Sequence, residues 1–140
     1  MYKRQGNLLK YYIPAQISGC LFGVMLANVF FEHALLELST KNRDGLHIFF
    51  SEIVATFGLI FIIFATLKDG KTIVAISVAT YISAGYWFTS STSFANPAVS
   101  IARTFTDSFT GINYLNTPTY ILAEFIGLIL AAYILKIIYK

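Results

Sequence analysis

Residues 89–111 read TSSTSFANPAVSIARTFTDSFTG, a hydroxyl-rich stretch between two strongly apolar segments. Asn is favoured at a helix N-cap, and Pro is favoured at the first helical position because its missing amide would be unpaired there anyway. The Asn96-Pro97-Ala98 triplet therefore predicts a helix that ends near Asp107. At ~1.5 Å per residue it measures about 16 Å, roughly half of the ~30 Å hydrocarbon core of a bilayer. A half-length helix at mid-membrane persists only where it lines a cavity or binds a solute.

The composition is that of a membrane protein. Hydrophobic residues make up 56% of the chain and charged residues only 12%, against about 25% charged in a soluble domain. The charges gather in short clusters, and the runs between the clusters are long enough to cross a bilayer. We expect an all-α protein of the cell membrane, with one domain over residues 1–140, a lipid bilayer around it and no nucleic-acid partner.

The uncharged runs predict four transmembrane helices around a re-entrant half-helix at about 96–107. They lie at about 11–31, 46–67, 72–88 and 119–135. Lys and Arg gather in the N-terminal stretch, in the turn at 68–71 and at the C-terminal end, and such positive segments stay on the cytoplasmic side. Both termini are therefore expected in the cytoplasm, and the half-helix enters from the outer face.

Small residues recur at helical spacing in two of these runs. Gly19, Gly23 and Ala27 form one stripe, and Gly127 and Ala131 form another. Such stripes allow two membrane helices to approach closely.

The single Cys20 excludes an internal disulfide. The four residues 17–20, with a basic stretch before them, resemble a bacterial lipoprotein cleavage site. The apolar run continues past Cys20 to Phe31, whereas a processed lipoprotein would turn polar there. We therefore interpret Cys20 as a small packing residue in a helix.

Three polar side chains in the apolar part of the chain are candidates for function. Asn96 offers two amide donors and one acceptor at the tip of the half-helix, either as a hydrogen-bond donor inside a pore or as a plain N-cap. Glu52 and Glu124 lie within predicted spans, where carboxylates are costly and normally face the bundle interior. They either relay protons or accept hydrogen bonds from the irregular backbone of the re-entrant loop. We favour the second role for Glu52 and leave Glu124 open.

The remaining charged candidates are less specific. Arg103 either lines an outer vestibule or pairs with Asp107 at i+4. His33 and His47 flank the loop between the first two predicted spans, and without a nearby Cys or Asp cluster we interpret them as surface residues rather than metal ligands. The sequence shows no nucleophile with a base, no phosphate loop and no metal site, so we expect neither an enzyme nor a cofactor.

The order of span, Asn-Pro-Ala half-helix and span resembles the second repeat of the aquaporin (major intrinsic protein) family. Residues 51–58 (SEIVATFG) look like the start of its fourth span, whose Glu braces the loop, and residues 12–19 (YIPAQISG) like the start of its third. Residues 86–99 (YWFTSSTSFANPAV) are most similar to a bacterial subgroup often associated with arsenic-resistance genes. The resemblance covers essentially the whole chain and implies a partial aquaporin-like fold and a homo-tetramer.

The selectivity filter departs from the usual family pattern. Most members place an Arg directly after this Asn-Pro-Ala, where this chain has Val99; the other two filter positions in this chain hold Ala84 and Ser93. Because all three side chains are small, the resemblance implies a wide filter that passes water, glycerol-like polyols or undissociated arsenous acid. The half-helix dipole would still oppose cations and protons.

The family's complete fold has six spans and two half-helices, and this chain resembles only its third span and second repeat. We therefore expect a channel component for passive transport of small neutral solutes, whose partner is a further copy in a homo-oligomer or a complementary N-terminal half. The alternative is a non-conducting truncated remnant or assembly subunit. A third hypothesis is a proton-coupled transporter that uses Glu52 and Glu124.

Overall fold

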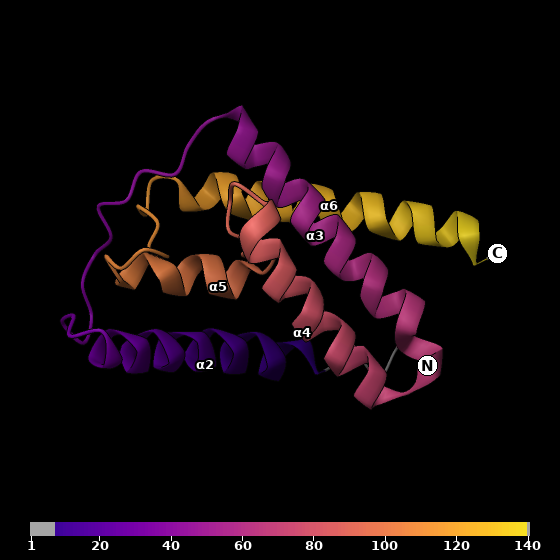
Figure 1. The fold of residues 1–140 in the computed structure, drawn as a ribbon, viewed down its shortest axis with the longest axis horizontal. Coiled ribbons are helices and arrows are strands. Elements are labelled where there is room, and N and C mark those ends of the chain that lie inside the picture. Colours follow the sequence, from indigo (N-terminus) through magenta and orange to yellow (C-terminus); the bar gives the residue numbers. More distant parts are fainter. Residues whose placement is uncertain (1–7, 140) are drawn as a thin grey trace. The chain divides into compact units, whose positions relative to one another are not determined.

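The computed structural model describes residues 8–139, and its regular structure is helical throughout (Figure 1). The α-helices are α2 (Leu9–Phe30), α3 (Leu46–Thr66), α4 (Lys71–Phe88), α5 (Pro97–Ala102) and α6 (Thr117–Ile138). Two 3-10 turns, η1 (Leu67–Asp69) and η2 (Arg103–Phe105), extend α3 and α5. The basic residues Lys3 and Arg4, on which the predicted topology partly rests, lie outside the described residues.

Within residues 8–139, three helices are long and apolar enough to cross a membrane. They are Leu9–Phe30, Leu46–Asp69 and Thr117–Ile138. The expectation of an all-helical protein is thus confirmed, and three of its helices are candidate membrane spans. The 18-residue α4 is not among the three, because Lys71 and several Ser and Thr residues lower its hydropathy. A fourth span at 72–88 stays a prediction.

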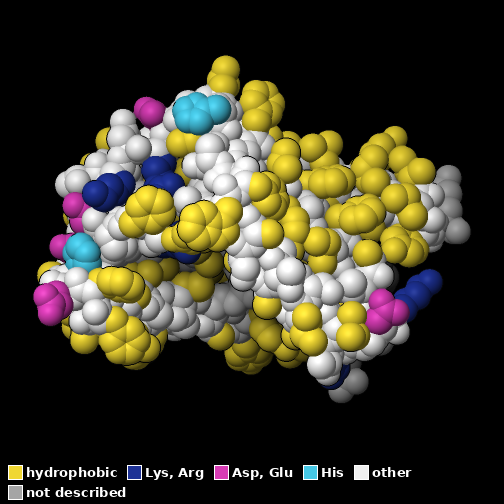
Figure 2. All heavy atoms as spheres, in the orientation of Figure 1, with side chains coloured by type: hydrophobic (Ala, Val, Ile, Leu, Met, Phe, Trp, Pro, Cys, Tyr) yellow, Lys and Arg dark blue, Asp and Glu magenta, His cyan; other side chains and the backbone are white. Residues whose placement is uncertain are grey.

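The surfaces of these helices are apolar. Figure 2 shows hydrophobic side chains over α3 and α6. The large hydrophobic side chains that stand exposed on these helices include Phe50, Val54, Phe125 and Ile129. Contiguous exposed apolar surface of this kind marks a contact with lipid or with another protein. Many of the large hydrophobic side chains of these helices are therefore exposed on the surface of the protein rather than buried in a core.

The chain forms two compact units. The first combines Met1–Asn42 with Ala98–Thr117, and the second combines Arg43–Pro97 with Pro118–Lys140. The first therefore contains α2 and most of α5, and the second contains α3, α4 and α6.

Close backbone contact joins α3 and α6 in the second unit. A Cβ atom added to Gly127 would lie 2.6 Å from the Ile53 carbonyl oxygen and 3.0 Å from Thr56 Cβ. Only a residue without a side chain fits at this crossing. On α6, Ala123 and Ala131 lie one turn to either side of Gly127 and are fully buried, as the predicted stripe of small residues requires.

The other predicted stripe has a different environment. A Cβ atom added to Gly19 or Gly23 on α2 would meet no atom within 4 Å in the described part of the chain. Cys20, on the same helix, is a half-buried free thiol inside the continuous stretch Leu9–Phe30.

A hydroxyl contact joins α3 and α4. The Tyr81 hydroxyl on α4 donates hydrogen bonds to the carbonyl oxygens of Ala55 (3.1 Å) and Val54 (3.3 Å) on α3. It lies where a Cβ atom on Gly58 would stand. The turn between the two helices contains Gly70 with φ 97°, a conformation that favours glycine. This turn, predicted at residues 68–71, directs α4 back along α3.

Candidate functional site

A short helix begins where the Asn-Pro-Ala triplet predicts it. The α5 helix starts at Pro97 and continues through η2 to Phe105, and Thr106 is extended (φ −146°, ψ 132°). At ~1.5 Å per α-helical and ~2.0 Å per 3-10 residue, the two pieces measure about 15 Å. The helix ends before Asp107, because Thr106 and Asp107 hydrogen-bond with the loop and helix that precede residue 42.

The loop before this helix, Thr89–Asn96, has an unusual backbone. Thr92, Ser93 and Ala95 have φ of 61°, 50° and 49°, in the left-handed region that side-chain-bearing residues rarely adopt. Each such residue costs about 1–3 kcal/mol and persists only where its surroundings hold it. The loop residues Ser91, Ser93 and Phe94 are almost fully buried, so their polar groups require partners inside the protein.

Side-chain oxygens supply those partners. Four successive amides, from Ser93 to Asn96, donate hydrogen bonds to side chains rather than to other backbone groups. The Ser93 amide donates to Ser91 Oγ at 3.3 Å. The next three amides donate to carboxylates on α3 and α6.

Glu52 on α3 is the first of these carboxylates. It is fully buried, its Oε2 accepts the Phe94 amide at 3.3 Å, and its Oε1 accepts the Ala95 amide. A carboxylate can accept hydrogen bonds at both oxygens, and hydrogen bonds to a charged group are stronger than neutral ones. Glu52 thus makes the contacts that the loop-bracing interpretation requires.

Glu124 on α6 is the second. It is 2% exposed, and its Oε1 accepts the Asn96 amide at 3.1 Å. The sequence offered no partner for Glu124, because the partner is a backbone group 28 residues away. Glu52 and Glu124 together hold the three residues that lead into α5.

Two aromatic residues that the sequence analysis did not single out complete the loop's surroundings. Tyr120 on α6 is 2% exposed; its ring centroid lies 4.8 Å from that of Phe94, and its hydroxyl donates to the Ser91 carbonyl at 3.4 Å. The Arg43 guanidinium lies 5.8 Å from the centre of the Phe94 ring, within the range of a cation–π contact. Tyr120 precedes Glu124 by four residues, or about one helical turn. This spacing is the sequence signal that could have placed both residues on one face of α6.

The predicted filter residues differ in their burial. Ser93 is buried against α4, whereas Ala84 on α4 is exposed and Val99 on α5 is half-buried. Ala84 and Ser93 belong to the second unit and Val99 to the first. Asn96 and Pro97 are half-buried and Ala98 is buried.

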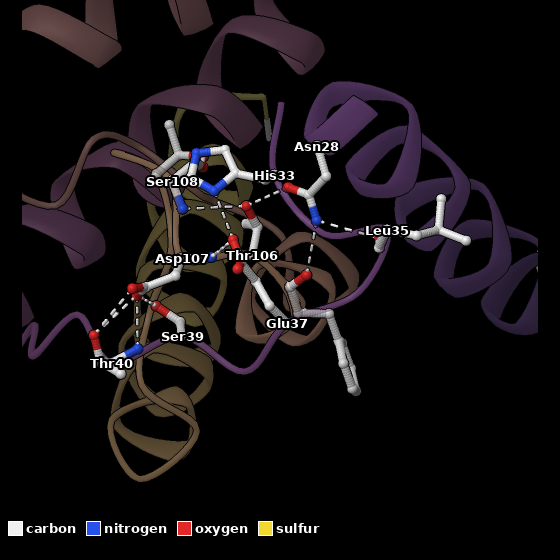
Figure 3. A network of polar contacts seen from close by, with 11 residues as sticks. Asn28, His33, Leu35, Glu37, Ser39, Thr40, Thr106, Asp107 and Ser108 are labelled. Carbon is white, nitrogen blue, oxygen red and sulfur yellow. Dashed lines mark hydrogen bonds and ion pairs between the residues drawn. The ribbon is translucent and has the colours of Figure 1, made fainter. Parts of the chain in front are cut away.

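A polar network fixes the segment that follows α5 within the first unit (Figure 3). Asn28 on α2 is 1% exposed; its Nδ2 donates to the carbonyl oxygens of Leu35 (3.3 Å) and Phe105 (3.1 Å), and its Oδ1 accepts the Thr106 hydroxyl at 2.5 Å. A neutral amide with both ends satisfied can be buried beside lipid-facing surface at little cost. Asn28 therefore ties the end of α2 to both segments that follow it in this unit.

Asp107 anchors the same segment to the loop after α2. Its carboxylate accepts hydrogen bonds from the Thr40 amide (2.7 Å), the Thr40 hydroxyl (3.1 Å) and the Ser39 hydroxyl (3.4 Å). The Thr40 amide, followed by the two hydroxyls and the nearby Lys41, holds the pKa of this carboxyl below its ordinary value. Pairing with Asp107 was one of the two roles predicted for Arg103. The backbone carbonyl oxygen of Arg103 accepts the Ile112 amide at 3.2 Å.

One of the two histidines also belongs to this network. His33 Nδ1 lies 2.7 Å from Glu37 Oε1, which accepts the Asp107 amide at 3.2 Å. Within residues 8–139, no group of three or more His, Cys, Asp or Glu side chains is placed to hold a metal ion.

Comparison with known proteins identifies one relative. The chain is 42% identical over 125 residues to a protein named aquaglyceroporin AqpS from Rhizobium meliloti (strain 1021). The match covers 89% of this chain and 54% of that protein, so the chain spans about half the length of the curated relative it matches. No protein-family model and no solved structure matches the chain.

Proposed function

The chain belongs to the aquaporin (major intrinsic protein) family, and we propose that it is the component of a multi-pass membrane channel that carries small neutral solutes passively. The observation that carries the proposal is the braced loop before α5. Glu52 and Glu124 fix the backbone of residues 94–96 from two different helices, so that Asn96 is held at the start of a half-length helix. In this proposal the Asn96 amide orients the passing solute, and Pro97 and Ala98 start the helix at that point.

The same geometry favours a channel over a proton-coupled transporter. A proton carrier gains and loses a proton during transport, and a protonated carboxyl is a weaker acceptor than a carboxylate. Glu52 accepts the buried Ala95 amide, and Glu124 accepts the half-buried Asn96 amide. Protonating either one would weaken the support of the loop, so we assign both to bracing.

The proposed architecture has four spans and a re-entrant half-helix in one partial aquaporin-like domain over residues 1–140. At ~1.5 Å per residue, the 18 residues of α4 measure about 27 Å, close to the ~30 Å hydrocarbon thickness. The roughly 15 Å of α5 and η2 reach halfway. The positive-inside rule then places both termini in the cytoplasm, with Arg103 in the outer vestibule.

We propose that Ala84, Ser93 and Val99 form a wide selectivity filter. None of these side chains brings a charge or a large ring, so the passage admits glycerol-like polyols and undissociated arsenous acid as well as water. The name of the Rhizobium relative, an aquaglyceroporin, agrees with a solute larger than water. The rest of the channel wall would come from a complementary N-terminal half, with a homo-tetramer as the assembled form.

A chimeric channel tests the proposal. The chain replaces the stretch of AqpS that it matches, the chimera is reconstituted into liposomes, and stopped-flow light scattering measures glycerol and water permeability. We expect glycerol permeability well above that of empty vesicles, and a loss of most of it in Asn96→Leu. The chain reconstituted alone is the parallel sample.

The competing proposal is a non-conducting remnant or assembly subunit, and the chain's match to about half of its relative is what motivates it. A chimera that folds, inserts and conducts neither water nor glycerol would favour that alternative and contradict the channel.

A further inference from the structure

We propose that Gly85 on α4 is a positioning residue that sets the place of the Ser93 side chain and, through it, the solute selectivity of the channel. The inference rests on the proposed function, because it gives Ser93 a place in the pore wall. Gly is unfavourable inside a helix, and Gly85 lies one turn before the end of α4. A contact that only Gly permits explains its presence there.

The contact is with Ser93. A Cβ atom added to Gly85 would lie 2.7 Å from Ser93 Oγ and 2.9 Å from Ser93 Cβ, closer than real Cβ atoms approach other atoms. The next nearest atom, Phe88 Cε1, is 3.9 Å away, at ordinary van der Waals distance. The Ser93 side chain therefore occupies the space that the missing side chain of Gly85 leaves on α4.

Gly85 also tethers the chain between α4 and Ser93. Its carbonyl oxygen accepts the amide of Thr89 at 3.0 Å and the hydroxyl of the same residue at 2.6 Å. The Thr89 carbonyl in turn accepts the Thr92 amide at 3.2 Å. The segment from Thr89 to Ser93 therefore contacts Gly85 twice: Thr89 hydrogen-bonds to its carbonyl oxygen, and the Ser93 side chain packs against its Cα.

Steric contact, rather than a hydrogen bond of its hydroxyl, holds the Ser93 side chain. Ser93 is 4% exposed, and its Oγ has no hydrogen-bond partner within residues 8–139. Its φ of 50° shows that the backbone is held in a conformation that Ser rarely adopts.

A side chain at position 85 would push Ser93 off α4. In the proposed pore this displacement moves a wall residue into the passage. Glycerol is larger than water, so its permeability should fall first.

Thiol labelling tests the positioning without any need for flux. In the full chain with Cys20→Ser, a Ser93→Cys thiol packed against Gly85 should react slowly with a methanethiosulfonate reagent. Adding Gly85→Ala should raise the labelling rate several-fold. Gly23→Ala is the matched control, because a Cβ atom there meets no atom within 4 Å in the described part of the chain, and it should leave the rate unchanged. An unchanged rate in Gly85→Ala would overturn the positioning role.

Flux through the AqpS chimera tests the effect on selectivity. Gly85→Ala should lower the ratio of glycerol to water permeability several-fold, and Gly23→Ala should leave it unchanged. Adding Ser93→Gly to Gly85→Ala removes both clashing atoms and accepts a positive φ, so this double variant should recover the stability that Gly85→Ala loses. Should Gly85→Ala fail to fold, the double variant decides: recovery of the fold supports the contact, and failure to recover overturns it.

An unchanged ratio of glycerol to water permeability in Gly85→Ala overturns the selectivity role. Absence of flux in the unsubstituted chimera contradicts the proposed function instead, and the labelling rates still decide the positioning.

Discussion

The carboxylate of Glu124 on α6 accepts the backbone amide of Asn96 at 3.1 Å. The residue at the start of the short helix is therefore held by the helix that follows it in the chain. Glu52 holds the two residues just before it from α3. The position of Asn96 therefore depends on both α3 and α6. A substitution of Glu124 on α6 affects the proposed pore through the Asn96 amide.

Substituting Glu124 should destabilise the protein, and the loss should be larger when the new side chain has no hydrogen-bond acceptor. Glu124→Leu leaves the half-buried Asn96 amide without this acceptor, and losing an acceptor inside a protein costs up to ~1–3 kcal/mol of unfolding free energy. Glu124→Gln keeps an oxygen in place and should lose less than half as much. Thermal unfolding followed by circular dichroism in detergent measures both, and equal losses in the two variants would contradict the role of the hydrogen bond.

Glu52→Gln distinguishes bracing from proton coupling. A bracing residue contributes an acceptor, so the variant should lower stability and leave solute flux indifferent to a pH gradient, as in the unsubstituted chimera. Liposomes loaded at one pH and diluted into another give the measurement. A gradient-driven flux in the parent that disappears in Glu52→Gln would instead support a transporter.

Val99→Arg should narrow the proposed filter. The resemblance to the aquaporin family implies that an Arg at this position adds both bulk and donors, and these restrict the passage to water. A tenfold loss of glycerol permeability, equivalent to about 1.4 kcal/mol of added barrier, with water permeability retained, is the expected result. Val99→Ala is the matched control and should leave glycerol permeability at least as high. Unaltered glycerol flux in Val99→Arg would remove Val99 from the filter.

Asp107 should make the first unit sensitive to acid. Hydrogen bonds from Thr40 and Ser39 keep the pKa of this carboxyl in the folded protein below its ordinary value of 3.8. The stability that this shift contributes is fully present above pH 3.8 and is lost as the pH falls through the lower folded value. Melting temperatures from about pH 6 to about pH 3 should therefore fall more steeply for the parent than for Asp107→Asn. Parallel curves would show that Asp107 makes no such contribution.

Gly111→Ala should disturb the same unit through its backbone. A Cβ atom there would collide with the Thr106 carbonyl oxygen and the Ser39 hydroxyl. Because the nearest atom belongs to the backbone, it cannot rotate away, and overpacking of this kind costs about 1–3 kcal/mol. Gly19→Ala, which meets open space in the described residues, is the control for the change of residue type. A Gly111→Ala variant as stable as Gly19→Ala would contradict the close approach of these segments.

Local signals in the sequence predicted the helices and the start of α5, because apolar runs and an Asn-Pro pair act through neighbouring residues. The same reasoning predicted that Glu52 braces the loop, since a carboxylate in an apolar helix needs donors; in the structure Glu52 accepts the Phe94 and Ala95 amides. The left-handed residues Thr92, Ser93 and Ala95 carried no signal, because none of them is Gly. Two of them are held by other helices: Glu52 on α3 accepts the Ala95 amide, and the Ser93 side chain packs against Gly85 on α4. The partners of Asn28 and Glu124 were equally hidden, since both bind groups far away in the chain.

The identity of the second brace has a consequence for how the protein is made. A ribosome delivers Thr92–Asn96 to the membrane before Glu124, so the loop enters with one carboxylate at hand and the other still to be synthesised. Its left-handed residues are costly to hold, and the Asn96 amide gains its acceptor only when α6 is inserted. The entry to the proposed pore is therefore completed by a helix that is synthesised after it, and a ribosome that stalls before α6 leaves the Asn96 amide without this acceptor.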